Sequence, residues 1–230
     1  MRKKLIVLAA AVLVVAVSAV ATSLAYFTST ADVANTFTVG NVEIKLDEAP
    51  VTKTGDKWTA DENADRVTAN EYKKIYPGAV LPKDPVVTNT GSYDAYVRVK
   101  VTINQASEWK SSIGANADLT SIFTFGDDFA ATWKLAETEI DSVKNTVTYT
   151  YNYIKDEGIL KGAVANSDGT TTEANTGALF TKVTVPAKFD NKEMEAIADF
   201  KIDIKAEAIQ TAGFDSQLAA FNALTTQLSA

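Results

Sequence analysis

Alternation of apolar and polar residues runs along several segments of the chain and predicts a mainly β protein. The longest example covers residues 95–103, where the apolar positions are Ala95, Val97, Val99, Val101 and Ile103. Successive side chains of a strand point to opposite faces of the sheet, so this spacing is typical of a strand with one face in the core. We expect the opposite face, which carries Arg98 and Lys100, to be polar.

Four further segments show the same period of two. They are Val42–Leu46, Val147–Tyr153, Val183–Val185 and Phe200–Ala208. In the second of these, Tyr149, Tyr151 and Tyr153 are predicted to pack in the core rather than to form a platform for stacking sugar rings. Residues 158–177 are rich in Gly, Ser, Thr and Asn and are predicted to form a mobile surface loop.

Residues 27–39 alternate less regularly and predict one strand or two in succession. Their apolar face would carry Phe27, Ala31, Val33, Phe37 and Val39. At Gly40 the phase shifts by one residue, and a Gly at such a shift indicates a β-bulge or a tight turn.

Turn signals separate the predicted strands. Pro77 and Gly78 fit the two central positions of a β-turn, because Pro presets φ and Gly accepts a positive φ. The turn predicted before residue 95 contains Asn89 and Gly91, which tolerate left-handed backbone. Residues 49–74 are mostly polar and predict a long exposed hairpin or loop.

Two short helices are predicted beside the strands. Ser107 would cap a helix that Gly114 ends, and Asp215 would cap one that reaches Leu228. The second helix would place Leu218, Phe221, Leu224 and Leu228 on one side.

Regularly spaced strands without intervening helices indicate an all-β fold, an antiparallel two-sheet β-sandwich with short peripheral helices. A jelly roll is the preferred form of this sandwich, although periodicity does not fix the strand order. Residues 26–230 are enough for one such domain, and no second domain is required.

The N-terminus has the order of a secretory signal. Arg2, Lys3 and Lys4 precede an uncharged run from Leu5 to Phe27. Ser23 and Ala25 offer a small-x-small cleavage site, so residues 1–25 would be a signal peptide removed by a signal peptidase. The alternative is an uncleaved anchor, since the uncharged run is long enough to span a bilayer. We expect a secreted protein of the extracellular matrix or the cell surface.

Charge and composition exclude several classes of function. Without the leader the chain has 19 basic and 29 acidic residues, so nucleic acid is not an expected partner. The chain contains no Cys and no His, which removes the usual nucleophile, general base and soft zinc ligands. We therefore assign no catalytic residue, no metal ligand and no cofactor.

Calcium would need oxygen ligands, which three pairs of adjacent acids could supply. The pairs are Asp47-Glu48, Asp61-Glu62 and Asp127-Asp128. None has the spacing of an EF-hand, and adjacent acids are more typical of a solvated edge.

Three segments resemble the TasA/camelysin family of secreted bacterial proteins that depend on a dedicated signal peptidase. At the beginning, the aromatic residues Tyr26 and Phe27 follow the cleavage point, and the pattern NTF-x-x-G-x-V-x-I-x-L covers residues 35–46. Residues 75–101 and 205–224 are also similar to the family, whereas the long polar insertions between them are not.

The resemblance implies a jelly-roll domain that forms fibres of a biofilm matrix or cell surface, with other copies of itself and an accessory anchor or matrix protein as partners. In such fibres the N-terminal segment of one subunit enters the sheet of the next as a donated strand. Backbone hydrogen bonds would supply the affinity, and alternate side chains would fix the register. The donated residues here would be Tyr26, Phe27, Ala31, Val33, Phe37 and Val39. The alternative is that this segment is the first strand of its own domain.

Two other functions stay open. The camelysin branch has been described as a metalloprotease, but this chain has no HExxH motif, and carboxylates alone make a poor zinc site, so we expect no enzyme. A monomeric surface adhesin would need the same sandwich, and it should tolerate loss of the first mature residues, whereas a fibre subunit should not.

Overall fold

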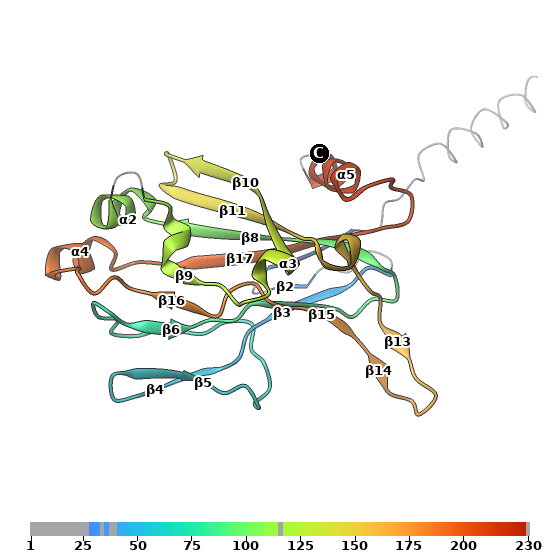
Figure 1. The fold of residues 1–230 in the computed structure, drawn as a ribbon, viewed down its shortest axis with the longest axis horizontal. Coiled ribbons are helices and arrows are strands. Elements are labelled where there is room, and N and C mark those ends of the chain that lie inside the picture. The colour runs from blue at the N-terminus through green and yellow to red at the C-terminus, as the bar shows by residue number, and fades with distance from the viewer. Residues whose placement is uncertain (1–27, 33–34, 37–40, 115–116, 229–230) are drawn as a thin grey trace, which may run out of the picture.

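The computed structural model describes residues 28–32, 35–36, 41–114 and 117–228, and it confirms a mainly β protein with short helices (Figure 1). Every strand pairing within these ranges is antiparallel. No helix in the described ranges is long and apolar enough to cross a membrane. The predicted leader, with Ser23 and Ala25, lies outside them.

The largest sheet has seven strands in the order β10-β11-β8-β17-β1-β2, with β12 also paired to β8. Its strands are β1 (Thr28–Asp32), β2 (Asn35–Thr36), β8 (Ala95–Asn104), β10 (Trp133–Asp141), β11 (Thr146–Tyr153), β12 (Ile159–Leu160) and β17 (Ile202–Gln210). Strands β8, β11 and β17 were predicted from their alternation. Strand β10 was not, because its residues from Lys134 to Ile140 are all exposed and show no apolar face.

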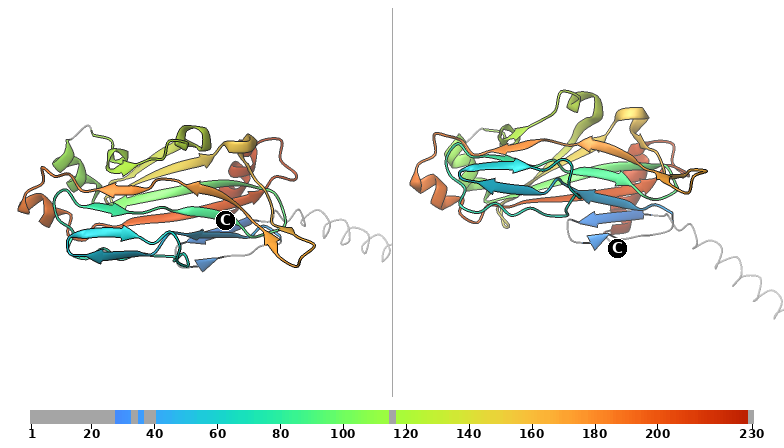
Figure 2. Two further views of the ribbon diagram at one scale, coloured as in Figure 1. Left: turned by 60° about the horizontal axis from the view of Figure 1, so that its bottom comes forward. Right: turned by 90° about the horizontal axis from the view of Figure 1, so that it is seen from below.

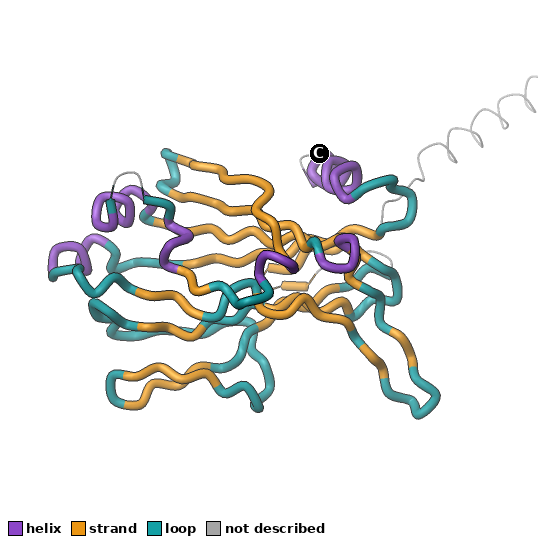
Figure 3. The backbone as a smooth tube through the Cα atoms, in the orientation of Figure 1, coloured by secondary structure: helices purple, strands orange, loops and turns teal. Residues whose placement is uncertain are grey.

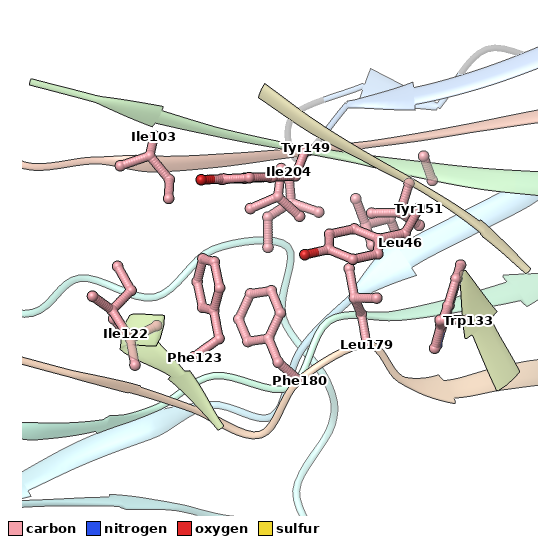
Figure 4. Close-up of a cluster of buried hydrophobic side chains, with 14 of the residues drawn as sticks. Leu46, Ile103, Ile122, Phe123, Trp133, Tyr149, Tyr151, Leu179, Phe180 and Ile204 are labelled. Atoms are coloured by element: carbon pink, nitrogen blue, oxygen red, sulfur yellow. The ribbon is translucent and has the colours of Figure 1, made fainter. Parts of the chain in front are cut away.

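Two three-stranded sheets lie alongside the large sheet (Figure 2). One sheet has the order β15-β7-β3 and consists of β3 (Ile44–Asp47), β7 (Val86–Asn89) and β15 (Ala174–Ala178). The other has the order β6-β16-β9 and consists of β6 (Val80–Pro82), β9 (Phe123–Thr124) and β16 (Lys182–Thr184). Apolar side chains of all three sheets form one buried cluster. In Figure 4, Ile103, Tyr149 and Ile204 of the large sheet face Phe123 and Phe180.

Two hairpins project from these sheets (Figure 3). They are β4 (Val51–Thr54) with β5 (Lys57–Ala60), and β13 (Val164–Ala165) with β14 (Thr171–Thr172). The first confirms the hairpin predicted within residues 49–74. The second shows that residues 158–177, predicted to form a mobile surface loop, contain short strands. The polar residues form the hairpin's turn, where Gly169 has a φ of +83° and Asp168 accepts a hydrogen bond from the Thr170 N–H.

The helices are short and peripheral. They are α2 (Ala106–Ile113), α3 (Phe129–Thr132), α4 (Asn191–Ala196), α5 (Gln217–Leu228) and the 3₁₀ helices η1 (Leu119–Ile122) and η2 (Lys155–Gly158). Helices α2 and α5 were predicted, but neither predicted cap is right. Helix α2 begins after Gln105, so Ser107 lies inside it. The capping residue of α5 is Ser216, whose Oγ accepts from the Ala219 N–H at 3.2 Å.

The buried side of α5 differs from the prediction. Leu218 and Leu228 are 71% and 50% exposed, whereas Ala220, Phe221 and Leu224 are buried. These three pack with Tyr96 and Ile209 on the outer face of the large sheet. The face of β8 predicted to be polar is therefore partly covered, and even Arg98 is only 8% exposed.

The turn at Pro77 and Gly78 is confirmed, because Gly78 has a φ of +83° and the Ala79 N–H donates to the Tyr76 carbonyl at 3.0 Å. Neither Asn89 nor Gly91 uses the left-handed backbone that it would tolerate, since neither has a positive φ. Asn89 is the last residue of β7. Gly91 is required for another reason, which is the close approach of residues 41–43. Gly40 lies outside the described residues.

We expect Gly91→Ala to lower the free energy of unfolding by about 3 kcal/mol, as overpacking of a tight site does. A Cβ at Gly91 would lie 2.3 Å from the Asn41 carbonyl oxygen and 2.5 Å from the Glu43 nitrogen, both backbone atoms. Gly126→Ala is the matched control, because its Cβ would meet only the Asp128 carboxylate at 3.1 Å. Urea unfolding followed by circular dichroism measures both, and equal effects of the two variants would contradict the prediction.

Candidate functional site

The described part of the predicted donor segment, β1 and β2, lies at one side of the large sheet, where β1 pairs with β17. The register runs from Thr28 opposite Ile209 to Asp32 opposite Lys205. Ala31 lies opposite Ala206, which is fully buried. The other five residues assigned to the donated strand, Tyr26, Phe27, Val33, Phe37 and Val39, lie outside the described residues. In a single chain, β1 thus lies between β17 and β2 in the large sheet.

The chemistry of β17 favours an added strand at this edge. Its core-side residues opposite β1 include the small, buried Ala206 and Ala208. Strand β1 also contacts β3 of the neighbouring sheet. A strand at this position therefore gains backbone pairing on one side and packing against a second sheet.

A buried ion pair holds β17 on the opposite face. Glu207 is 1% exposed, and its carboxylate accepts from Arg98 Nε at 2.6 Å. The Arg98 guanidinium lies 4.7 Å from the centre of the Phe221 ring of α5. Buried contacts thus hold β8, β17 and α5 together, so β17 has a fixed position where it pairs with β1.

The far edge of the large sheet is built differently. Strand β10 has a register shift between Leu135 and Glu137, and its exposed positions include the charged residues Lys134, Glu137 and Glu139. Bulges and charges on an edge strand oppose pairing with another chain. Of the two ends of the large sheet, the β10 end thus has features that oppose pairing with another chain.

A cavity of about 470 Å³ lies beside the first residues of β17. Its apolar lining is formed by Tyr72, Ile75, Leu81, Val183, Phe200 and Ile202, and its polar residues include Glu48, Lys83, Asp199 and Asp203. These residues come from four distant segments of the chain, so no local sequence pattern pointed to them.

Ion pairs hold the segment that forms one wall of this cavity. Arg66 donates from Nε to Asp47 at 2.6 Å and from Nη1 to Asp84 at 2.8 Å. Lys83 Nζ lies 2.7 Å from Glu48. Asp47 and Glu48, considered above for calcium, therefore already have cationic partners.

We expect Arg66→Ala to lower the free energy of unfolding by about 2 kcal/mol, because it removes one of the two cationic partners of a buried carboxylate and leaves only Lys45 at 2.8 Å. The Asp47 side chain is only 3% exposed, while Arg66 is 29% exposed, which reduces the loss below that of a fully buried pair. Lys73→Ala is the control, since Lys73 and Glu71 form a pair that is more than 70% exposed on both sides. Denaturant unfolding distinguishes the two, and a loss of similar size for both would contradict this role of Arg66.

The other candidate ligand groups are not assembled into a site. Asp61, Glu62, Asp127 and Asp128 are exposed. Within the described ranges, no group of three or more Asp, Glu, His or Cys residues is placed to hold a metal ion.

The tyrosine stripe of β11 is part of the core, as predicted. Tyr149, Tyr151 and Tyr153 are each 2–3% exposed, so no sugar-stacking platform forms there. Burial raises the pKa of all three hydroxyls, and the hydrogen bond from Tyr149 to Asp118 adds to the effect at Tyr149. Burial also raises the pKa of Tyr72 in the cavity wall.

An alkaline titration tests this burial. A raised pKa in the folded chain means that folding is fully supported below the unfolded value of about 10 and is weakened as the pH rises above it. We expect at least four of the eight tyrosines to ionise only as the chain unfolds. Ultraviolet absorbance and circular dichroism recorded together would show this. Ionisation of all tyrosines with the β structure intact would contradict it.

No protein-family model matches this chain, and comparison with curated proteins and with solved structures finds no match either.

Proposed function

We propose that this protein is a secreted structural subunit that assembles into fibres of a bacterial cell surface or biofilm matrix. Each subunit gives its N-terminal strand to the next one. The TasA/camelysin-like segments and the secretory leader support this proposal. The three antiparallel sheets also support the finer interpretation of the fold as a jelly-roll sandwich. We propose a structural rather than a catalytic role.

One observation carries the proposal, the pairing of β1 with β17. Five residues of β1 lie opposite five residues of β17, and β1 is the first strand in the described part of the chain. An identical strand from a second copy would make the same backbone contacts, so exchange replaces one set of contacts by an equal set. Exchange from one chain to the next in a single direction is heterologous and produces open filaments unless the ring closes.

Size measurements on the intact protein test the proposal. The protein would be exported under its own leader, purified in the form that cells release, and examined by light scattering and negative-stain electron microscopy over a range of concentrations. We expect filaments that grow with concentration. Ile140→Asp, on the exposed edge of β10, is the control and should assemble normally. A protein that stays monomeric at all concentrations would overturn the proposal and favour the adhesin.

A further inference from the structure

Strand β17 extends beyond the strand that covers its edge. The pairing with β1 ends at Lys205, opposite Asp32, but β17 begins three residues earlier at Ile202. No described strand pairs with residues 202–204 on this side. The cavity of about 470 Å³ lies against the same stretch, since residues 198–203 line it.

If β1 continued past Asp32 in the same register, it would run along β17 toward this cavity. Each residue forward along β1 moves the partner one residue back along β17. A strand that continued straight past Asp32 would bring Asn35 opposite Ile202 and Phe37 level with Phe200. Residues directly opposite each other in an antiparallel pair share a face of the sheet. Phe37 would therefore lie on the face of Phe200 and Ile202, which both line the cavity.

In the single chain, the described residues of β2 do not take this path. Asn35 pairs with Asp32 on the side of β1 away from β17. Only Val33 and Ala34 connect the two strands. Two-residue hairpin loops favour Asn-Gly or similar pairs that accept a positive φ, and a β-branched Val is poorly suited to them. The sequence therefore supports the hairpin weakly and an extended strand well.

We propose that the cavity beside Ile202 is the docking site for residues 33–39 of a second copy of this chain, inserted as a straight continuation of β1. This inference rests on the proposed strand donation and adds the register and the site. The apolar lining from Ile75, Leu81, Val183 and Phe200 suits Phe37 and Val39 of the incoming strand. The longer strand also provides more contacts between two subunits than exist within one, which favours assembly over the monomer.

Engineered cysteines test the register directly, because the natural chain contains none. In the proposed assembly, Thr36 of one copy lies opposite Lys201 of the next, and directly opposite residues are close enough for a disulfide. Within one chain, Thr36 pairs with Ala31, which pairs with Ala206. Within one chain, Thr36 is therefore two strand spacings and five residues from Lys201. This distance is about 20 Å, which is too far for a disulfide.

The variant Thr36→Cys with Lys201→Cys, exported and purified as above, would be oxidised and run on a denaturing gel without reductant. We expect a ladder of covalent oligomers that collapses to monomer on reduction. Thr36→Cys with Lys134→Cys is the matched control, because Lys134 is an equally exposed lysine on the distant edge strand β10. It should give no ladder.

Filaments with no ladder from the first pair, or with equal ladders from both pairs, would overturn this docking site and leave strand donation standing. If neither filaments nor a ladder form, both proposals are wrong. Phe37→Ala provides a second measurement, since loss of a buried aromatic side chain should raise the concentration needed for filaments about tenfold or more. Unchanged assembly of Phe37→Ala would also overturn the docking site.

Discussion

A chain that begins at Gly40 is expected to form no filaments at concentrations where the intact protein forms them. It lacks β1 and β2, and with them every residue of the proposed donor segment. It should still fold, because strands β8, β10, β11 and β17 pair with one another without β1. Loss of the β1 pairing leaves the edge of β17 open and should lower the free energy of unfolding by on the order of 3 kcal/mol.

Light scattering and electron microscopy measure the assembly, and circular dichroism measures the fold. The full-length Ile140→Asp protein is the control, because it changes the surface but keeps β1. Filaments from the folded chain that begins at Gly40 would contradict strand donation. A shortened chain that fails to fold would show that β1 is indispensable to its own domain, contrary to the expectation that the remaining strands fold without it.

Arg98→Ala is expected to lower the free energy of unfolding by about 3 to 5 kcal/mol, the usual effect of removing one partner of a buried ion pair. The change leaves Glu207 with Lys100 at 3.5 Å and Lys205 at 3.9 Å, both longer contacts than the 2.6 Å bond from Arg98. It also removes the guanidinium from the Phe221 ring, so α5 should detach more easily from the sheet. Denaturant unfolding and near-ultraviolet circular dichroism measure the two effects.

A double variant controls for the buried charge. Arg98→Met with Glu207→Met removes both partners, and replacement of a buried pair by apolar residues is often neutral or stabilising. We expect it to be clearly more stable than Arg98→Ala alone. A loss below about 1 kcal/mol for Arg98→Ala would contradict the importance of this pair.

The strands that could be predicted are those with one buried face and one polar face. In β11 and β17 the alternation in sequence matches the alternation of burial at most positions, so the period alone identified them. Strand β10 was not predicted, because it is an edge strand with little burial between its two ends, and its sequence WKLAETEID has no period of two. Helix α5 was found, but its buried side depends on which face of β8 it covers, which the local sequence does not reveal.

The candidate site was predictable only in part. The pattern of residues 27–39 indicated strands before Gly40, and β1 and β2 lie there. Arg66 stands in a polar stretch that looked like an exposed loop, and its two carboxylate partners are 18 and 19 residues away in sequence. The cavity also depends on tertiary packing, since it joins residues at position 48, within 69–83, at position 183 and within 198–203.

Binding of a synthetic peptide with the sequence of residues 26–39 to the folded chain that begins at Gly40 is the most direct measurement of strand donation. Fluorescence anisotropy of the labelled peptide and thermal unfolding of the chain would be recorded together, with a scrambled peptide as control. Strand donation predicts saturable one-to-one binding that raises the unfolding temperature. A folded chain that does not bind the peptide, or that binds the scrambled peptide equally well, would contradict strand donation.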